Sequence, residues 1–176
     1  MDSLIVFFSK IDRPKLVLEV LIIVADLSLY KAEQLVQMGF VKPLISWISL
    51  GGLRYQELAV LAIGNIAGDG PQMRDFVINN GVIQPLLALV NQETPTTLLR
   101  TVTWTMSNFC RNRTTSTPVE VMQCLPVLAQ LVQHSDREVL ADACWALSYL
   151  ADSSGEIQVL IFQQAEMPKS RKMNKD

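Results

Sequence analysis

The heptapeptide GFVKPLI at residues 39–45 recurs as GVIQPLL at residues 81–87. A third, more divergent copy, PVLAQLV, begins at Pro126. The three prolines of this series, Pro43, Pro85 and Pro126, follow one another at intervals of 42 and 41 residues. Proline is favoured in the first turn of a helix, where its missing N–H group has no intrahelical partner to lose. The sequence therefore predicts a repeated unit that contains a helix beginning near each proline.

A second series with the same period lies between the prolines. It consists of apolar residues at positions i, i+4 and i+7, the spacing of one helix face. Three copies are 43 and 41 residues apart, and a weaker fourth copy precedes them. Two independent series with one period indicate two main helices in each unit. The copies are Val20, Val24 and Leu27; Ala59, Ile63 and Ile66; Val102, Met106 and Phe109; and Ala143, Leu147 and Leu150.

The repeats predict an all-α fold. A period of about 40 to 47 residues with two or three helices is typical of armadillo and HEAT repeats, whose units stack into a superhelix with a concave groove. We expect a right-handed armadillo-repeat superhelix of about four repeats over residues 1–153, the first repeat being degenerate. A divergent, disordered basic tail is expected over residues 154–176. The long helices are predicted near 14–28, 54–67, 96–111 and 137–151, and the shorter ones near 3–9, 43–50, 85–91 and 125–133.

Composition and charge exclude several classes of protein. Hydrophobic residues make up 49% of the 176 residues, so a large core is expected and global disorder is not. Proteins that bind nucleic acid through bulk electrostatic attraction are normally basic, so the net charge of −2 argues against such binding. Glu19 and Asp26 interrupt the most apolar stretch, so we expect no membrane span, and the N-terminus does not resemble a signal peptide. The three cysteines are interpreted as reduced thiols of an intracellular protein in the cytoplasm and nucleus, without cofactor or metal.

The residues beside each apolar stripe form a second pair at i and i+4, which places both members on one helix face. Across stacked units these pairs should form a ladder. The carboxamide of asparagine offers donors and an acceptor to the backbone of an extended peptide. Indole faces attract cations and pack against alkyl chains. The ladder therefore suits an extended Lys/Arg-rich peptide, although tryptophan in the core and asparagine as a helix cap remain the alternative explanation. The pairs are Ile22 and Asp26; Leu61 and Asn65; Trp104 and Asn108; and Trp145 and Tyr149.

Catalytic constellations are not visible, and we do not expect an enzyme. The single histidine, His134, has Ser135 and Asp136 only as sequence neighbours, and these two residues better suit the N-cap of the next helix. The turn at residues 68–70 is too short for a phosphate-binding loop.

At the residues of the ladder the sequence resembles the importin-α (karyopherin-α) family, armadillo adaptors that carry proteins with nuclear-localisation signals. The resemblance is dense from about Glu57 to Asp152 and thinner before it. The matching segments are GNIAGDG at 64–70, RDFVI at 74–78, TWTMSNFCRN at 103–112 and EVLADACWALSYL at 138–150.

The resemblance implies roles for individual residues. Asn65 and Asn108 match asparagines that hold the backbone of the signal peptide. Trp104 matches a tryptophan that forms the wall of a lysine pocket, and Asp69 matches the acid that pairs with the key lysine. Leu61 occupies another wall position. Positions farther along the groove are matched by Arg111, Asp142, Trp145 and Tyr149.

The chain also departs from the family pattern. The family has tryptophan at the positions of Ile22 and Leu61 and asparagine at that of Asp26, so part of the expected cation–π attraction is missing. The loop between Glu93 and Leu99 is shorter than in the family. The basic N-terminal segment that recruits importin-β and the later repeats are absent here, so we do not expect importin-β binding. A regulatory decoy, a degenerate scaffold and a receptor for an apolar peptide therefore remain as alternatives to an import adaptor.

Overall fold

The computed structural model describes residues 14–111 and 119–152, which form helices and turns without a strand. The segments predicted near 3–9 and 154–176 lie outside these residues. The described elements are α2 (Pro14–Ser28), α3 (Ala32–Gln37), α4 (Val41–Leu50), α5 (Leu53–Gly68), α6 (Pro71–Asn79), α7 (Ile83–Ala88), α8 (Thr96–Cys110), the 3₁₀ helix η1 (Val119–Cys124), α9 (Leu125–Leu131) and α10 (Arg137–Ala151).

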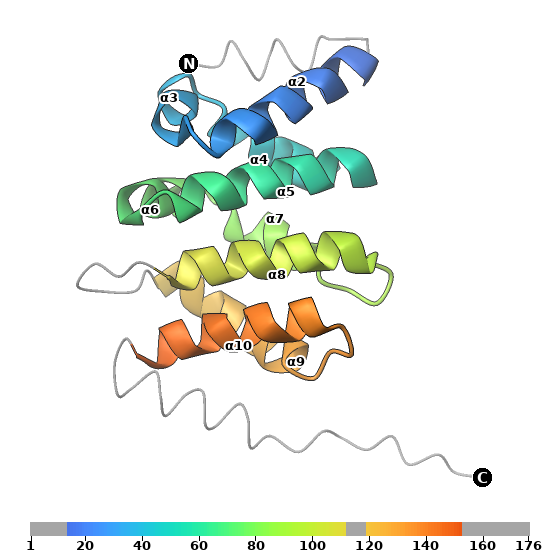
Figure 1. The fold of residues 1–176 in the computed structure, drawn as a ribbon, viewed down its shortest axis with the longest axis vertical. Helices are drawn as coiled ribbons and strands as arrows, with labels where there is room; N and C mark the ends of the chain where they lie inside the picture. The colour runs from blue at the N-terminus through green and yellow to red at the C-terminus, as the bar shows by residue number, and fades with distance from the viewer. Residues whose placement is uncertain (1–13, 112–118, 153–176) are drawn as a thin grey trace.

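The four long helices α2, α5, α8 and α10 stack in chain order, and the shorter helices form a second layer (Figure 1). Each long helix contacts the long helix of the neighbouring unit, and α5 and α10 also pack on the short helices α4 and α9 of their own units. The predicted α-solenoid is therefore confirmed. The predicted long helices agree with the observed ones to within one residue at each end.

Two local signals explain where the short helices begin. Gly39 and Gly81 have φ angles of 82° and 84°, a left-handed conformation that favours glycine. These glycines end α3 and α6 and turn the chain into α4 and α7. Pro43 and Pro85 lie in the first turns of α4 and α7, as the repeat predicts. The fourth unit has no such glycine, and η1 continues directly into α9.

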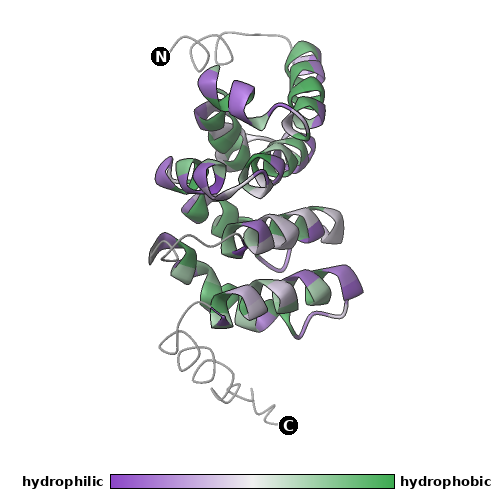
Figure 2. Cartoon of the chain, turned by 60° about the vertical axis from the view of Figure 1, so that its left-hand side comes forward, coloured by the Kyte–Doolittle hydropathy of each residue, from purple (hydrophilic) through white to green (hydrophobic). Residues whose placement is uncertain are grey.

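The apolar stripes form one continuous aliphatic core. In α5 and α8 every stripe residue is buried, and in α10 Ala143 and Leu150 are buried while Leu147 is partly exposed. The first stripe is only partly in the core, because Val24 is buried but Leu27 is 43% exposed. Figure 2 shows hydrophobic residues along much of α2, the uppermost long helix. The degenerate first copy therefore leaves part of its apolar surface open.

The interpretation of two main helices per unit is incomplete, because α3, α6 and η1 add a third helical segment. Helix α6 was not predicted from its sequence, because Arg74 interrupts its apolar pattern. Arg74 is nevertheless buried, and its Nη1 donates a 2.7 Å hydrogen bond to the backbone carbonyl of Arg111 at the end of α8. Its guanidinium group also pairs with Asp75. An arginine that normally marks a surface position here joins two helices.

Candidate binding face of the long helices

The eight ladder residues lie on α2, α5, α8 and α10, and we call the surface that they form the ladder face. Its outer row is Ile22, Leu61, Trp104 and Trp145, and its inner row is Asp26, Asn65, Asn108 and Tyr149. Because these four helices are neighbours in the stack, each row passes from one helix to the next. Three residues of the outer row are open to solvent, from 38% exposure at Ile22 and Leu61 to 59% at Trp145, whereas Trp104 is partly buried. Large apolar side chains that remain this exposed favour a contact surface over a core role.

A pocket of about 300 Å³ lies on the ladder face between α5, α8 and α10. It brings together four of the predicted residues, Leu61, Asn65, Trp104 and Asp142. Three further lining residues were not predicted, because their sequence positions lie outside the i and i+4 pairs. These residues are Arg100, Thr101 and Glu138.

The indole of Trp104 lies directly on the backbone of α5. A Cβ atom at Gly64 would be 2.4 Å from a ring carbon of Trp104, so only glycine admits the ring at this depth. At the equivalent position below Trp145, one repeat farther on, the residue is Ser107. Trp145 is more exposed, at 59%, whereas Trp104 is partly buried. Residues of α10 line the same pocket as Trp104, while Trp145 lies on α10 itself, the last described helix.

The two asparagines of the inner row connect neighbouring repeats. Asn65 Nδ2 donates a 2.9 Å hydrogen bond to Ser28 Oγ on α2. Asn108 Nδ2 donates a 3.1 Å bond to the carbonyl of Gly64, and its side chain is only 3% exposed. Arg111 repeats the pattern one turn later, with Nη2 donating to the carbonyl of Gly68 at 3.2 Å. Asn65 still lines the pocket. The side chain of Asn108 instead bonds to α5 and is buried, so it has little surface left for hydrogen bonds to a peptide.

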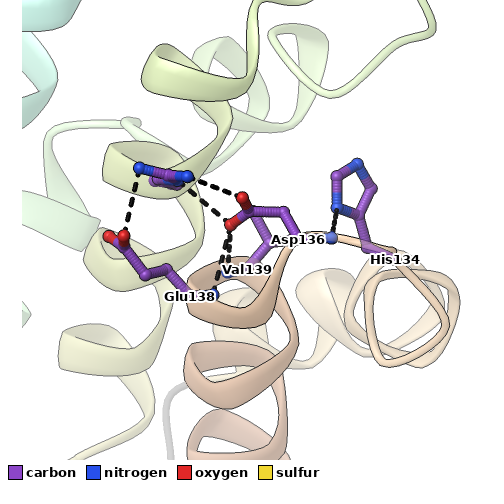
Figure 3. A network of polar contacts seen from close by, with 5 residues as sticks. His134, Asp136, Glu138 and Val139 are labelled. Atoms are coloured by element: carbon purple, nitrogen blue, oxygen red, sulfur yellow. Dashed lines mark hydrogen bonds and ion pairs between the residues drawn. The ribbon is translucent and has the colours of Figure 1, made fainter.

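An ion-pair network borders the pocket (Figure 3). Arg100 Nε and Nη2 contact the two carboxylate oxygens of Asp136 at 3.0 and 2.7 Å, and Nη1 contacts Glu138 Oε1 at 3.0 Å. The hydrogen bond from Arg100 lowers the pKa of Asp136 to about 2. Asp136 also caps α10, as predicted, by accepting hydrogen bonds from the N–H groups of Glu138 and Val139. His134 takes part only through Nδ1, which accepts from the backbone N–H of Asp136.

Asp142 differs from these paired acids. Burial is the main cause that raises its pKa, and the negative charge of Glu138 raises it further. Within residues 14–111 and 119–152, no ion pair involves Asp142. The pocket therefore combines an indole wall with a partly desolvated carboxylate that a cation would stabilise.

The remaining predicted residues lie outside the pocket. Asp69 is exposed and follows the last residue of α5, while Arg111 follows the last residue of α8. Trp145 and Tyr149 stack on each other on α10, with ring centroids 6.0 Å apart and planes 26° apart. This pair extends the aromatic surface by one repeat beyond Trp104.

The described residues contain no cluster of three or more His, Cys, Asp or Glu side chains that could hold a metal ion. Every helix in the described ranges is too short or too polar to cross a membrane.

Comparisons with known proteins agree with this architecture. The model of the armadillo/β-catenin-like repeat matches residues 70–111 and 118–152, the units that end with α8 and α10. Importin subunit α-2 of Arabidopsis thaliana is 34% identical over 166 residues, covering 93% of this chain and 31% of the relative. The chain is an armadillo-repeat relative of the importin α subunits. Importin subunit α-5 of the same plant is 43% identical over 114 residues, covering 65% of this chain and 22% of the relative.

The solved structures confirm the armadillo fold. A designed armadillo repeat protein in complex with the peptide (KR)4 superposes with a TM-score of 0.80 at 20% identity, covering 87% of this chain and 65% of that chain. This importin α-like chain spans about a third of the length of the importin α relatives that it matches along most of its length.

Proposed function

We propose that this importin α-like chain binds an extended Lys/Arg-rich peptide, of the kind that forms a nuclear-localisation signal, on its ladder face. The observation that carries the proposal is the pocket in which Trp104 stands beside the carboxylate of Asp142, which forms no ion pair with any described residue. A lysine side chain has the two matching parts, an apolar stem and a cationic end.

The chemistry of each part of the pocket suits such a side chain. The alkyl stem would pass between Leu61 and the indole of Trp104, which also attracts the cation. The ammonium group would then meet Asp142 and Glu138. Asn65 supplies a carboxamide at the same pocket for the peptide backbone. Farther along, the stacked rings of Trp145 and Tyr149 offer a second aromatic wall.

In the cell this binding would serve as a non-catalytic adaptor function in the transport of proteins between cytoplasm and nucleus. The relatives named importin subunit α support this part of the proposal. The cargo would be proteins that carry a basic localisation signal, with no direct contact to nucleic acid or membrane.

Fluorescence anisotropy with a labelled lysine-rich peptide tests the proposal, and a peptide with glutamine in place of each lysine is the control ligand. We expect saturable binding of the basic peptide only. Trp104→Ala should weaken it by about 2- to 30-fold, the equivalent of one cation–π contact, and Asp142→Asn should weaken it as well. Leu50→Ala is the matched control, since Leu50 is 86% exposed at the end of α4 and off the ladder face. Equal binding of both peptides, or no effect of either pocket variant, would contradict the proposal.

A further inference from the structure

Four charged side chains surround the pocket of the ladder face. Arg100, Glu138 and Asp142 line it, and Asp136 is the second partner of Arg100. One positive and three negative charges give this group a net charge of −2. Arg100 lies one helical turn before Trp104, so both side chains belong to one face of α8. A cation of the chain itself therefore lies in the pocket that we propose for a ligand cation.

The same contact between neighbouring repeats is made without a cation one repeat earlier. The counterpart of Arg100 on α5 is Glu57, 43 residues before it, just as Leu61 is the counterpart of Trp104. Thr97 on α8 is the counterpart of Glu138, and its Oγ1 donates a 3.0 Å hydrogen bond to Glu57 Oε1. Stacking of the repeats therefore does not require an arginine at this position, which leaves the charge of Arg100 available for another role.

Arg100 and a ligand cation would compete for Glu138. Arg100 Nη1 is 3.0 Å from Glu138 Oε1, and the two side chains are 41% and 67% exposed. Ion pairs this exposed contribute little to stability, so a bound peptide can alter this one. Asp142, by contrast, forms no ion pair with any described residue. A first ligand cation would therefore pair with Asp142, and a second one beside it would be repelled by the guanidinium group of Arg100.

We propose that Arg100 is a specificity-determining residue of the ladder-face pocket. It occupies the cation position at Glu138, so that the pocket accepts one lysine or arginine side chain at Asp142 and disfavours a second basic side chain beside it. The preferred ligand is then a peptide whose pocket residue is basic and whose nearest neighbours are uncharged or acidic. This inference rests on the proposed function and narrows its ligand class.

Two labelled peptides of equal length measure this preference. One has lysine at every position, and the other has lysine at every third position with glutamine between. Three residues of an extended chain span about 10 Å, close to the distance between neighbouring helices, so a lysine in the pocket has only neutral neighbours in the second peptide. Fluorescence anisotropy at one salt concentration gives the ratio of the two affinities for each protein. We expect Arg100→Gln to shift this ratio toward the all-lysine peptide by about two- to fivefold, the contribution of one partly exposed ion pair.

Three further variants of the full chain separate the local charge from other effects. Lys42→Gln removes the same charge from an exposed position on α4, in the second layer, and should leave the ratio unchanged. Arg100→Lys keeps the charge and should preserve the ratio of the unmodified chain. Arg100→Met removes the charge but keeps an alkyl stem, and it should shift the ratio as Arg100→Gln does. Because both affinities in a ratio come from one protein, an inactive fraction of that protein cancels.

The outcomes distinguish this inference from the proposed function. Peptide binding with an unchanged ratio in both Arg100→Gln and Arg100→Met would overturn the role of Arg100 and leave the proposed function intact. An equal shift in Lys42→Gln would do the same, by showing that the total charge of the chain sets the ratio. If neither peptide binds saturably to any of the proteins, the proposed function is refuted, and this inference with it.

Discussion

Replacing Leu61 by tryptophan should strengthen the binding of a lysine-rich peptide, and the gain should be largest when Ala25 is also replaced by glycine. Leu61 is the equivalent of Trp104 one repeat earlier, and Ala25 is the equivalent of Gly64. Asn65 has the carbonyl of Ala25 within 3.5 Å, just as Asn108 bonds to the carbonyl of Gly64, which supports this correspondence. A Cβ atom at Gly64 would come within 2.4 Å of the Trp104 ring, so the Cβ of Ala25 should obstruct an indole at residue 61 in the same way.

The size of the effect follows from the chemistry of the added ring. A correctly placed indole contributes about 0.5–2 kcal/mol to the binding of a cation, which is about 2- to 30-fold in affinity. Ala25→Gly by itself should cost about 1 kcal/mol of stability, because it lies inside α2. The gain is therefore measured against Ala25→Gly as the reference and not against the unmodified chain.

Anisotropy titrations of four proteins decide the question: the unmodified chain, the two single variants and the double variant. We expect the double variant to bind the lysine-rich peptide more tightly than Ala25→Gly does, and Leu61→Trp alone to gain less. The glutamine peptide should show no such gain. A gain in affinity cannot arise from damage to the fold. If Leu61→Trp alone gains as much as the double variant, the packing argument is wrong, and if neither gains, the ladder face does not bind basic side chains at this repeat.

Three further predictions concern single residues. If the exposed acid Asp69 contacts the peptide, Asp69→Lys should weaken binding of the basic peptide by more than about 1.4 kcal/mol, a factor of ten. An unchanged affinity would show that Asp69 is not part of the binding site. Asn108→Ala should lower the free energy of unfolding by about 1–3 kcal/mol, because it leaves the carbonyl of Gly64 without its 3.1 Å partner, and thermal or urea unfolding measures this loss. Because the pKa of Asp136 is lowered from 3.8 to about 2 in the folded chain, its contribution to stability is present above about pH 4 and disappears as the pH falls through about 2. Urea unfolding should therefore show Asp136→Asn less stable than the unmodified chain at neutral pH but nearly equal to it near pH 2, and a difference that persists at low pH would refute the role of the Arg100 ion pair.

Local signals that repeat along the chain were sufficient to predict the long helices, the short helices α4, α7 and α9, and their order. Proline near a helix start and an apolar stripe act within a few residues, and their common period indicates that the units stack. The N-cap at Asp136 was predictable for the same reason. The segments α3 and η1 escaped prediction because they lie outside both repeated series, and α6 escaped because Arg74 is buried by a hydrogen bond to a carbonyl 37 residues away.

The sequence also determined which residues share the ladder face, since residues at i and i+4 on repeated helices must align when the repeats stack. Only the tertiary structure decided which of them are open to a ligand. Asn65 and Asn108 occupy equivalent positions, yet one lines a pocket and the other is almost completely buried against Gly64. The pairing of Arg100 with Asp136 and Glu138 likewise depends on side chains from different helices, and among the described residues it leaves Asp142 as the acid of the pocket without an ion pair. Such outcomes depend on how side chains of neighbouring repeats pack, for example the Trp104 ring against Gly64, and the sequence of one helix alone does not reveal this packing.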